Sequence, residues 1–149
     1  MDISPLTAEL SIGSAPKKGT ITTEICDLLV LAACNFQPPD SDYPEVQVLK
    51  VPLIDGGQPP SIGHVRIAIN AARAIVFRIR EGDRVLVTCE KGHNRSALVA
   101  GMALLGLGWS APQAIKAIVK ARGDAAFSNK YFVGILRRYM ADGAGTVLK

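Results

Sequence analysis

One stretch of the sequence is the most informative about the fold: Val85-Leu86-Val87-Thr88-Cys89-Glu90-Lys91-Gly92-His93-Asn94-Arg95-Ser96-Ala97. Its apolar, β-branched start, its short polar middle and the apolar run that follows Ala97 predict a strand, a loop and a helix in succession. In that order Cys89 lies in front of a helix N-terminus, where backbone N–H groups converge and the helix dipole adds positive potential. The stretch therefore predicts an anion site with a cysteine beside it.

The thiol of Cys89 is expected to be ionised at neutral pH. A free thiol has a pKa of about 8.5, and a helix N-terminus with neighbouring cations lowers it to roughly 3.5–7.5. Arg95 adds a planar fork of donors that matches two oxygens of a phosphoryl group. Gly92 stands where a backbone folded around an oxyanion needs a positive φ or close approach, and Ser96 can donate its hydroxyl proton to the sulfur. The expected chemistry is attack by a thiolate on phosphorus.

The composition indicates one globular domain. The chain has 149 residues, 48% hydrophobic and 20% charged, which is ordinary for a soluble protein with its own core. We expect a single domain over residues 1–141 and a flexible tail over 142–149. The 17 basic residues, with a net charge of +4, are scattered, so we interpret them as a solvated surface and expect no stable nucleic-acid partner.

The sequence favours a cytoplasmic protein. No basic and then apolar segment follows Met1, and the longest uncharged apolar run, 97–109, is shorter than the roughly 20 residues that cross a bilayer. We therefore expect no membrane contact. An odd number of cysteines fits a reducing compartment. The spacings of Cys26, Cys34 and Cys89 match no zinc pattern, and no metal is expected. The sequence leaves the oligomeric state open, and a monomer is compatible with it.

Strand and helix patterns alternate along the chain. We predict strands at 9–14, 27–33, 46–53 and up to Thr88, and helices at 62–81, 97–107, 111–121 and from Ser128 to near residue 141. Such alternation predicts an α/β fold, with a mostly parallel central sheet of four to five strands that helices flank and that is covered on both sides. Ligands of these sheets bind beyond the carboxyl ends of the strands, where Cys89 and Asp55 both fall.

Asp55 is the candidate general acid. A phosphoester departs poorly unless its bridging oxygen receives a proton. Asp55 follows a predicted strand, begins a glycine-containing loop and precedes Cys89 by 34 residues. The alternative is that Asp55 only caps a turn, as aspartates before glycine often do. Asp124 is the reserve candidate, whereas Asp40 and Asp42 precede their strand and belong at the opposite end of the sheet.

Cys89, Gly92, Arg95 and Ser96 match the Cys-x5-Arg-Ser/Thr signature of the cysteine-dependent protein tyrosine phosphatase superfamily. The surroundings resemble its dual-specificity branch over most of the chain. The further matching positions are 10–14, 51–55, Arg122, Asn129, Phe132 and Leu136. The chain departs from the family at Thr88, where histidine is usual. Low-molecular-weight phosphatases carry a similar loop near the N-terminus, and its place in the last half of this chain disfavours their architecture.

The resemblance implies two displacements at phosphorus without a cofactor or a metal. Cys89 would form a phosphocysteine while Asp55 protonates the leaving group, and water activated by Asp55 would then release phosphate while Ser96 stabilises the thiolate. The implied phosphate-binding residues are those of the loop: Glu90, Lys91, Gly92, His93, Asn94 and Arg95. We also expect the Asn94 side chain to brace the loop. Cys34 lies near where some members keep a cysteine that forms a reversible disulfide with the nucleophile.

The expected substrate is phosphotyrosine in proteins, with phosphoserine and phosphothreonine as further candidates. Gly-x-Asn-Arg at 92–95 also resembles RNA triphosphatases of the superfamily, but these release a good leaving group and can work without an acid such as Asp55. Phosphoinositide phosphatases tend to carry extra lysines in the loop, where this chain has Glu90. A catalytically dead phospho-binding module is disfavoured because Cys89 and Arg95 are both present.

Overall fold

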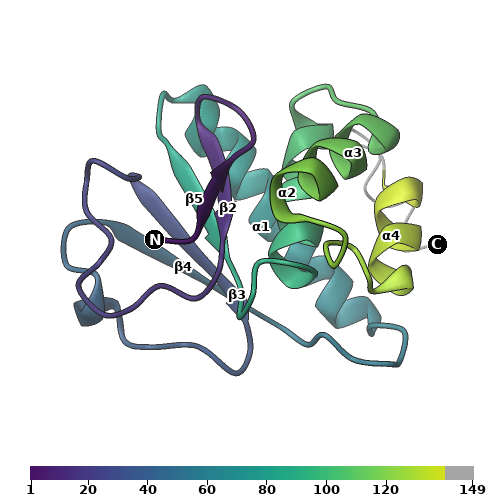
Figure 1. The fold of residues 1–149 in the computed structure, drawn as a ribbon, viewed down its shortest axis with the longest axis horizontal. Helices are drawn as coiled ribbons and strands as arrows, with labels where there is room; N and C mark the ends of the chain where they lie inside the picture. Colours follow the sequence, from purple (N-terminus) through teal and green to yellow (C-terminus); the bar gives the residue numbers. More distant parts are fainter. Residues whose placement is uncertain (140–149) are drawn as a thin grey trace.

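The strand that carries the loop, β5 (Val85–Thr88), lies at the centre of a five-stranded sheet in the computed structural model, which describes residues 1–139 (Figure 1). The other strands are β1 (Ile3–Pro5), β2 (Leu10–Gly13), β3 (Leu28–Ala33) and β4 (Gln47–Leu53). Their order is β1-β2-β5-β3-β4, and only β1 is antiparallel to its neighbour. The predicted α/β fold with a mostly parallel sheet of four to five strands is confirmed.

Four α-helices follow in the described part of the chain. They are α1 (Ile62–Arg80), α2 (Arg95–Gly106), α3 (Ala111–Arg122) and α4 (Lys130–Arg138), and a short 3-10 helix, η1 (Asp40–Asp42), precedes β4. Ser61 caps α1 by accepting a hydrogen bond from the His64 N–H, and Ser110 with Gln113 forms the predicted capping box of α3. Across residues 1–139, no helix combines the length and the apolar content needed to span a membrane.

The helices cover one face of the sheet, and loops cover the other. Alternate strand residues such as Val30 and Val87 pack against the helices, whereas Leu29, Leu31 and Leu86 pack with residues of the β2–β3 and β3–β4 connections, among them Tyr43. Both faces are buried, as predicted, but the expectation of flanking helices holds for one face only. The two connections carry no helical periodicity and cover the second face as loops, held in part by the hydrogen bond from Tyr43 Oη to the Pro16 carbonyl (2.7 Å).

The structure contains one strand that the sequence did not predict, and two helices begin at other residues than expected. The strand β1 was not predicted, because three residues that include Pro5 show no alternation. The last helix is capped by Asn129, not Ser128, since Asn129 Oδ1 accepts from the N–H groups of Tyr131 and Phe132. Helix α2 begins at Arg95, two residues earlier than expected. The predicted end of the last helix near residue 141 and the predicted tail at 142–149 lie outside the described residues.

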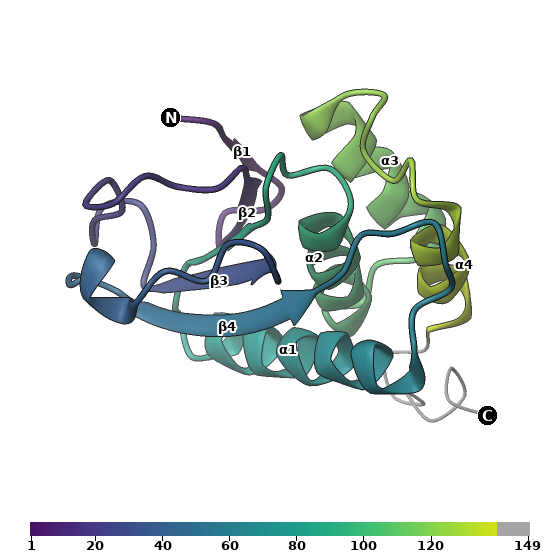
Figure 2. The same cartoon turned by 90° about the horizontal axis from the view of Figure 1, so that it is seen from below.

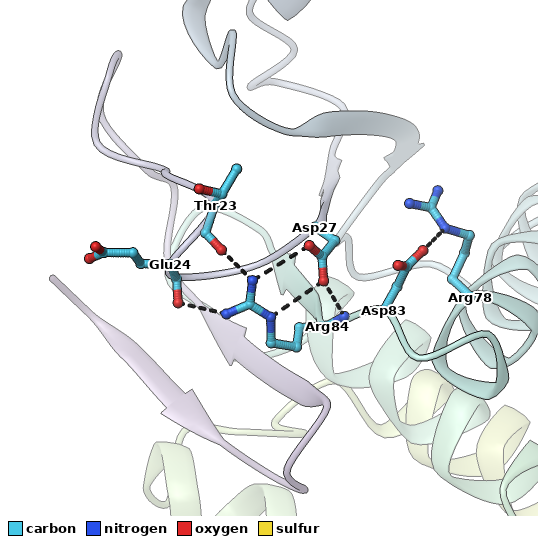
Figure 3. Close-up of polar contacts among 6 residues, drawn as sticks. All are labelled: Thr23, Glu24, Asp27, Arg78, Asp83 and Arg84. Carbon is cyan, nitrogen blue, oxygen red and sulfur yellow. Dashed lines mark hydrogen bonds and ion pairs between the residues drawn. The ribbon is translucent and has the colours of Figure 1, made fainter.

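A polar cluster secures the amino end of the central strands (Figure 3). Arg84 donates to the carbonyl oxygens of Thr23 and Glu24 and to the Asp27 carboxylate, which also accepts from the Arg84 N–H at 2.8 Å. The hydrogen bond from the Arg84 backbone N–H has the largest effect on the pKa of Asp27, followed by that from the Arg84 side chain, and together they hold it below its ordinary value. Beside them Asp83 accepts from Arg78 Nε at 2.5 Å. The cluster fixes the start of β5 next to β3, at the end of the sheet opposite to Cys89.

Candidate active site

The thiol of Cys89 lies in the loop that joins β5 to α2. Cys89 is 4% exposed, and its Sγ lies 3.1 Å from Ser96 Oγ. Burial acts to raise the pKa of the Cys89 thiol. Hydrogen bonds from the Ser96 hydroxyl, and from the backbone N–H groups of Ser96, Gly92 and His93, outweigh burial and hold the pKa of Cys89 below its ordinary value. The hydrogen bonds that the loop donates to the sulfur therefore favour the thiolate.

Thr88, which stands where the resembling family has histidine, has another role in this chain. Its hydroxyl donates to the Val30 carbonyl at 3.0 Å and is buried. The bond ties β5 to β3 directly before the loop begins. Backbone amides and Ser96 therefore account for the lowered pKa of Cys89, and the Thr88 side chain contributes by fixing where the loop starts.

The Arg95 guanidinium keeps a buried donor, Nε, that makes no hydrogen bond within the described part of the chain. The residue is 7% exposed, and its Nη1 donates to Asn35 Oδ1 at 2.9 Å and to the Leu53 carbonyl at 3.4 Å. Its Nη2 lies 3.6 Å from Glu90 Oε2. Its Nε is buried and has no partner among residues 1–139. A buried charged donor without an acceptor is costly, so this atom indicates where an oxyanion belongs.

Glu90 and Asn35 together orient Arg95. Asn35 Nδ2 donates to Glu90 Oε2 at 3.3 Å, so the two side chains and the guanidinium form one network. Because the Glu90 carboxylate is used on Arg95, only its backbone is suited to a bound phosphate. Sequence reasoning missed Asn35. The available signal was its position two residues after β3, at the same carboxyl edge of the sheet as Cys89.

Arg122 at the end of α3 holds the back of the loop. Its Nε donates to the Gly92 carbonyl at 3.1 Å and its Nη2 to the Lys91 carbonyl at 2.9 Å. In a trans peptide the N–H points away from the C=O, so the N–H groups of Gly92 and His93 face the opposite side, toward the sulfur. The Arg122 side chain is 5% exposed and is fixed by the Asp2 carboxylate at 2.7 and 2.9 Å. These hydrogen bonds lower the pKa of Asp2 to about 2.

Gly92 has both properties that the sequence predicts for it. Its φ is +72°, and a Cβ there would lie 2.6 Å from Arg122 Nη2 and 2.7 Å from the Gly13 carbonyl oxygen. We expect Gly92→Ala to reduce stability by about 1–3 kcal/mol and to raise the pKa of Cys89, because the loop must move away from Arg122. Denaturant unfolding and the pH dependence of iodoacetate alkylation measure the two effects.

Gly19 supplies the matched control for this change. Its φ is +75°, but no atom lies within 4 Å of the Cβ position. Gly19→Ala should therefore cost about 1 kcal/mol through the backbone alone and leave the alkylation profile of Cys89 unchanged. An unaltered profile in Gly92→Ala as well would contradict the role given to Gly92.

The loop borders a cavity of about 220 Å³ that also contains Asp55. The six loop residues that line it are Cys89, Glu90, Lys91, His93, Asn94 and Arg95. Asp55 Oδ2 accepts from Asn94 Nδ2 at 3.1 Å, and Oδ1 accepts from Asn129 Nδ2 at 2.9 Å. Two neutral donors thus orient the carboxylate beside the thiol. The reserve candidate Asp124 does not line this cavity, and Asp40 and Asp42 lie in η1.

Asn94 is the brace that the sequence predicts. Its amide nitrogen donates to Asp55 and to Ser128 Oγ, and its Oδ1 accepts from the Asn129 N–H at 2.9 Å. The side chain therefore connects the loop to the Asp55 segment and to the start of α4. Both amide protons of the Asn94 side chain are used in these hydrogen bonds, so at this residue only the backbone N–H can bind a phosphate.

The three cysteines differ in their environments. All three are free thiols. Burial raises the pKa of Cys26 to about 11, opposite to the direction at Cys89. Cys34 is exposed and does not line the cavity, although its neighbour Asn35 contacts Arg95. Among residues 1–139, no cluster of three or more His, Cys, Asp or Glu side chains is arranged to hold a metal ion.

Solved structures of phosphatases share this fold. No family model and no curated protein matches the sequence. A mouse protein of the dual specificity phosphatase type, complexed with zinc tungstate, is 28% identical, with a TM-score of 0.72 over 91% of this chain and 84% of that one. Human DUSP28 is 25% identical, with a TM-score of 0.76 over 92% and 91%. Tk-PTP in its active form is 21% identical, with a TM-score of 0.77 over 95% and 97%.

The similarity of fold extends over 84–97% of the length of these three neighbours. On that fold, the strand, loop and helix carry the Cys89-x5-Arg95-Ser96 signature at the carboxyl edge of the sheet. The chain therefore resembles the cysteine-dependent protein tyrosine phosphatase superfamily, and its dual-specificity branch in particular, in both fold and signature.

Proposed function

We propose that this protein hydrolyses phosphomonoesters through a phosphocysteine at Cys89, with phosphotyrosine in proteins as its best substrate and phosphoserine and phosphothreonine as lesser ones. The proposal is carried by two groups that line one cavity: the Cys89 thiol, whose pKa is lowered, and the buried Arg95 Nε, which has no partner among the residues that the structure describes. A nucleophile and an oxyanion ligand are thereby brought to the same phosphoryl group.

In the first step the Cys89 sulfur attacks phosphorus, and the bond to the ester oxygen breaks. The backbone N–H groups of the loop and the Arg95 guanidinium bind the three other oxygens and stabilise their charge. Asp55, which shares the cavity with the thiol, gives its proton to the departing oxygen. The products are the free alcohol or phenol, a phosphocysteine and the Asp55 carboxylate.

In the second step water attacks the phosphocysteine. The Asp55 carboxylate, oriented by Asn94 and Asn129, removes a proton from this water. The sulfur–phosphorus bond breaks, and the Ser96 hydroxyl, 3.1 Å from the sulfur, stabilises the thiolate that leaves. Inorganic phosphate departs, and the site returns to its starting protonation.

The charges that line the cavity support a singly phosphorylated substrate. Asp55 and Glu90 are acidic, and Lys91 and Arg95 are basic. Such a balanced lining suits one phosphoryl group and opposes a triphosphate or a headgroup with several phosphates. Asp55 is needed for a poor leaving group and not for the good one that an RNA triphosphatase releases. We place the protein in the cytoplasm, because the mechanism requires a reduced Cys89.

Turnover of five substrates tests the proposal. They are p-nitrophenyl phosphate, a phosphotyrosine peptide, a phosphothreonine peptide, a 5′-triphosphorylated RNA and a phosphoinositide. We expect the phosphotyrosine peptide to have the highest kcat/KM of the four biological substrates. Higher kcat/KM for the RNA or the phosphoinositide would overturn the assignment to proteins while keeping the phosphatase chemistry.

Substrates with different leaving groups test the role of Asp55 as the general acid. Asp55→Asn should lower kcat/KM for a phosphotyrosine peptide by about 10²–10⁴-fold and that for p-nitrophenyl phosphate much less, because p-nitrophenolate leaves without a proton. Asp124→Asn is the matched control and should behave as wild type. Equal losses with both substrates in Asp55→Asn would remove Asp55 as the acid.

Cys34 remains the proposed redox partner of Cys89. Its exposure and its position at the end of β3, beside β5, support the proposal. Mild peroxide should then trap a disulfide between the two sulfurs, detected as a linked peptide by mass spectrometry. Recovery of sulfenic or over-oxidised Cys89 with Cys34 still free would count against the pairing.

A further inference from the structure

A groove leads away from the catalytic cavity between the β4–α1 connection and α4, two segments that lie side by side in Figure 2. A cavity of about 470 Å³ shares Asp55 and Asn94 with the catalytic cavity. A second one, of about 420 Å³, shares Lys130 and Tyr131 with the first. The three cavities therefore adjoin one another in a row. We call the outer one the side groove, and its walls include Pro59, Pro60, Ile62, Lys130, Tyr131 and Arg138.

The side groove has an apolar wall that is open to a ligand. Ile62, the first residue of α1, is 57% exposed although it is a large apolar side chain. Pro59 and Pro60 precede it and restrict the backbone, so this wall is already ordered before a ligand binds. The buried Val65 and Ile135 lie behind it. An apolar side chain of a bound molecule would gain contact here.

The charges of the side groove are of one sign. Lys130 and Arg138 line it, and the described lining residues include no carboxylate. The Lys130 ammonium lies 5.7 Å from the centre of the Tyr131 ring, and both residues also line the cavity of about 470 Å³ that lies between the side groove and the catalytic cavity. Carboxylates of a bound molecule would therefore be attracted along the whole groove.

We propose that the side groove binds the substrate protein next to its phosphorylated residue and selects a segment with an apolar side chain and one or more carboxylates. This inference rests on the proposed protein phosphatase function. The observations favour a peptide over a phosphoinositide. A headgroup with several phosphates needs cations around Cys89. Of the described lysines and arginines, Lys91 and Arg95 line that cavity, whereas Lys130 and Arg138 line the side groove.

Three phosphotyrosine peptides test the inference in direct competition. One carries Leu-Glu-Asp on the amino side of the phosphotyrosine and Gly-Ser elsewhere, the second carries Leu-Glu-Asp on the carboxyl side, and the third carries Gly-Ser throughout. We expect one of the two acidic peptides to exceed the third in kcat/KM by about tenfold. Equal values for all three would overturn the inference.

Substitutions in the side groove test whether the preference for the acidic peptide arises there. Arg138→Glu should reduce the ratio of kcat/KM between the preferred and the Gly-Ser peptide by about fivefold, and Arg138→Lys should largely keep it. Ile62→Ser should reduce the ratio to a similar extent. Lys116→Glu makes the same charge change on α3, away from the groove, and should leave the ratio as in wild type.

The failure of the inference and that of the proposed function have different signatures. Wild-type turnover of all three peptides without preference, or a preference that Arg138→Glu leaves unchanged, overturns the side groove alone. Turnover of a phosphoinositide but of no phosphopeptide overturns the proposed function, and the inference with it.

Discussion

Cys89→Ser is expected to lower turnover of every phosphomonoester by a factor on the order of 10⁵. A serine hydroxyl in this loop is not ionised at neutral pH, whereas the hydrogen bonds from Ser96 and from the backbone N–H groups stabilise a thiolate. Those donors and Arg95 remain in the variant, so it should still bind a phosphotyrosine peptide. Initial rates and titration calorimetry measure the two properties.

Cys34→Ser is the matched control for this change. The exposed Cys34 does not line the cavity, so under reducing conditions its serine variant should turn over substrate as wild type does. Activity of Cys89→Ser within tenfold of wild type would show that another group attacks phosphorus. Loss of peptide binding together with a lowered Tm would indicate that the loop has not folded.

Arg95→Lys should lower kcat/KM by about 10³–10⁴-fold even though the charge is kept. Arg95 contacts Asn35, Leu53 and Glu90 through its terminal nitrogens and still has Nε unpartnered among residues 1–139. A lysine ammonium cannot reach those partners and two phosphoryl oxygens at once. Stability should also fall, by about 1–3 kcal/mol, because buried acceptors lose a donor.

Arg84→Lys distinguishes loss of a catalytic contact from loss of structure. Arg84 also makes several hydrogen bonds, but at the opposite end of the sheet (Figure 3). Its lysine variant should be less stable and, below its Tm, should keep the kcat/KM of wild type. A drop in kcat/KM of similar size in both variants would contradict the role given to Arg95.

The local parts of the site could be predicted from the sequence because each depends on consecutive residues. A strand, a loop and a helix follow directly from the run at 85–97, and the need for glycine at position 92 follows from a backbone that turns around one point. Asp55 could be placed as well, since the carboxyl ends of parallel strands share one edge of the sheet.

Contacts between segments that are far apart in the sequence could not be predicted, because no pattern of consecutive residues marks them. Asp2 and Arg122 are 120 residues apart, and their ion pair behind the loop depends on where a three-residue strand and the end of α3 meet. Asn35 reaches Arg95 from a loop without periodicity. The loops that cover the second face of the sheet have scattered apolar residues such as Tyr43, which sequence patterns do not distinguish from a surface loop.

The most direct test of the account is to find the residue that carries phosphate during turnover. Asp55→Asn should form the phosphoenzyme from p-nitrophenyl phosphate, which needs no acid, and hydrolyse it slowly, because the base for water is missing. Rapid acid quenching followed by peptide mass spectrometry should locate one phosphoryl group on the Cys89 sulfur, and none in the variant that also carries Cys89→Ser. Phosphate on another side chain such as His93, or steady hydrolysis with no phosphoenzyme, would contradict the account.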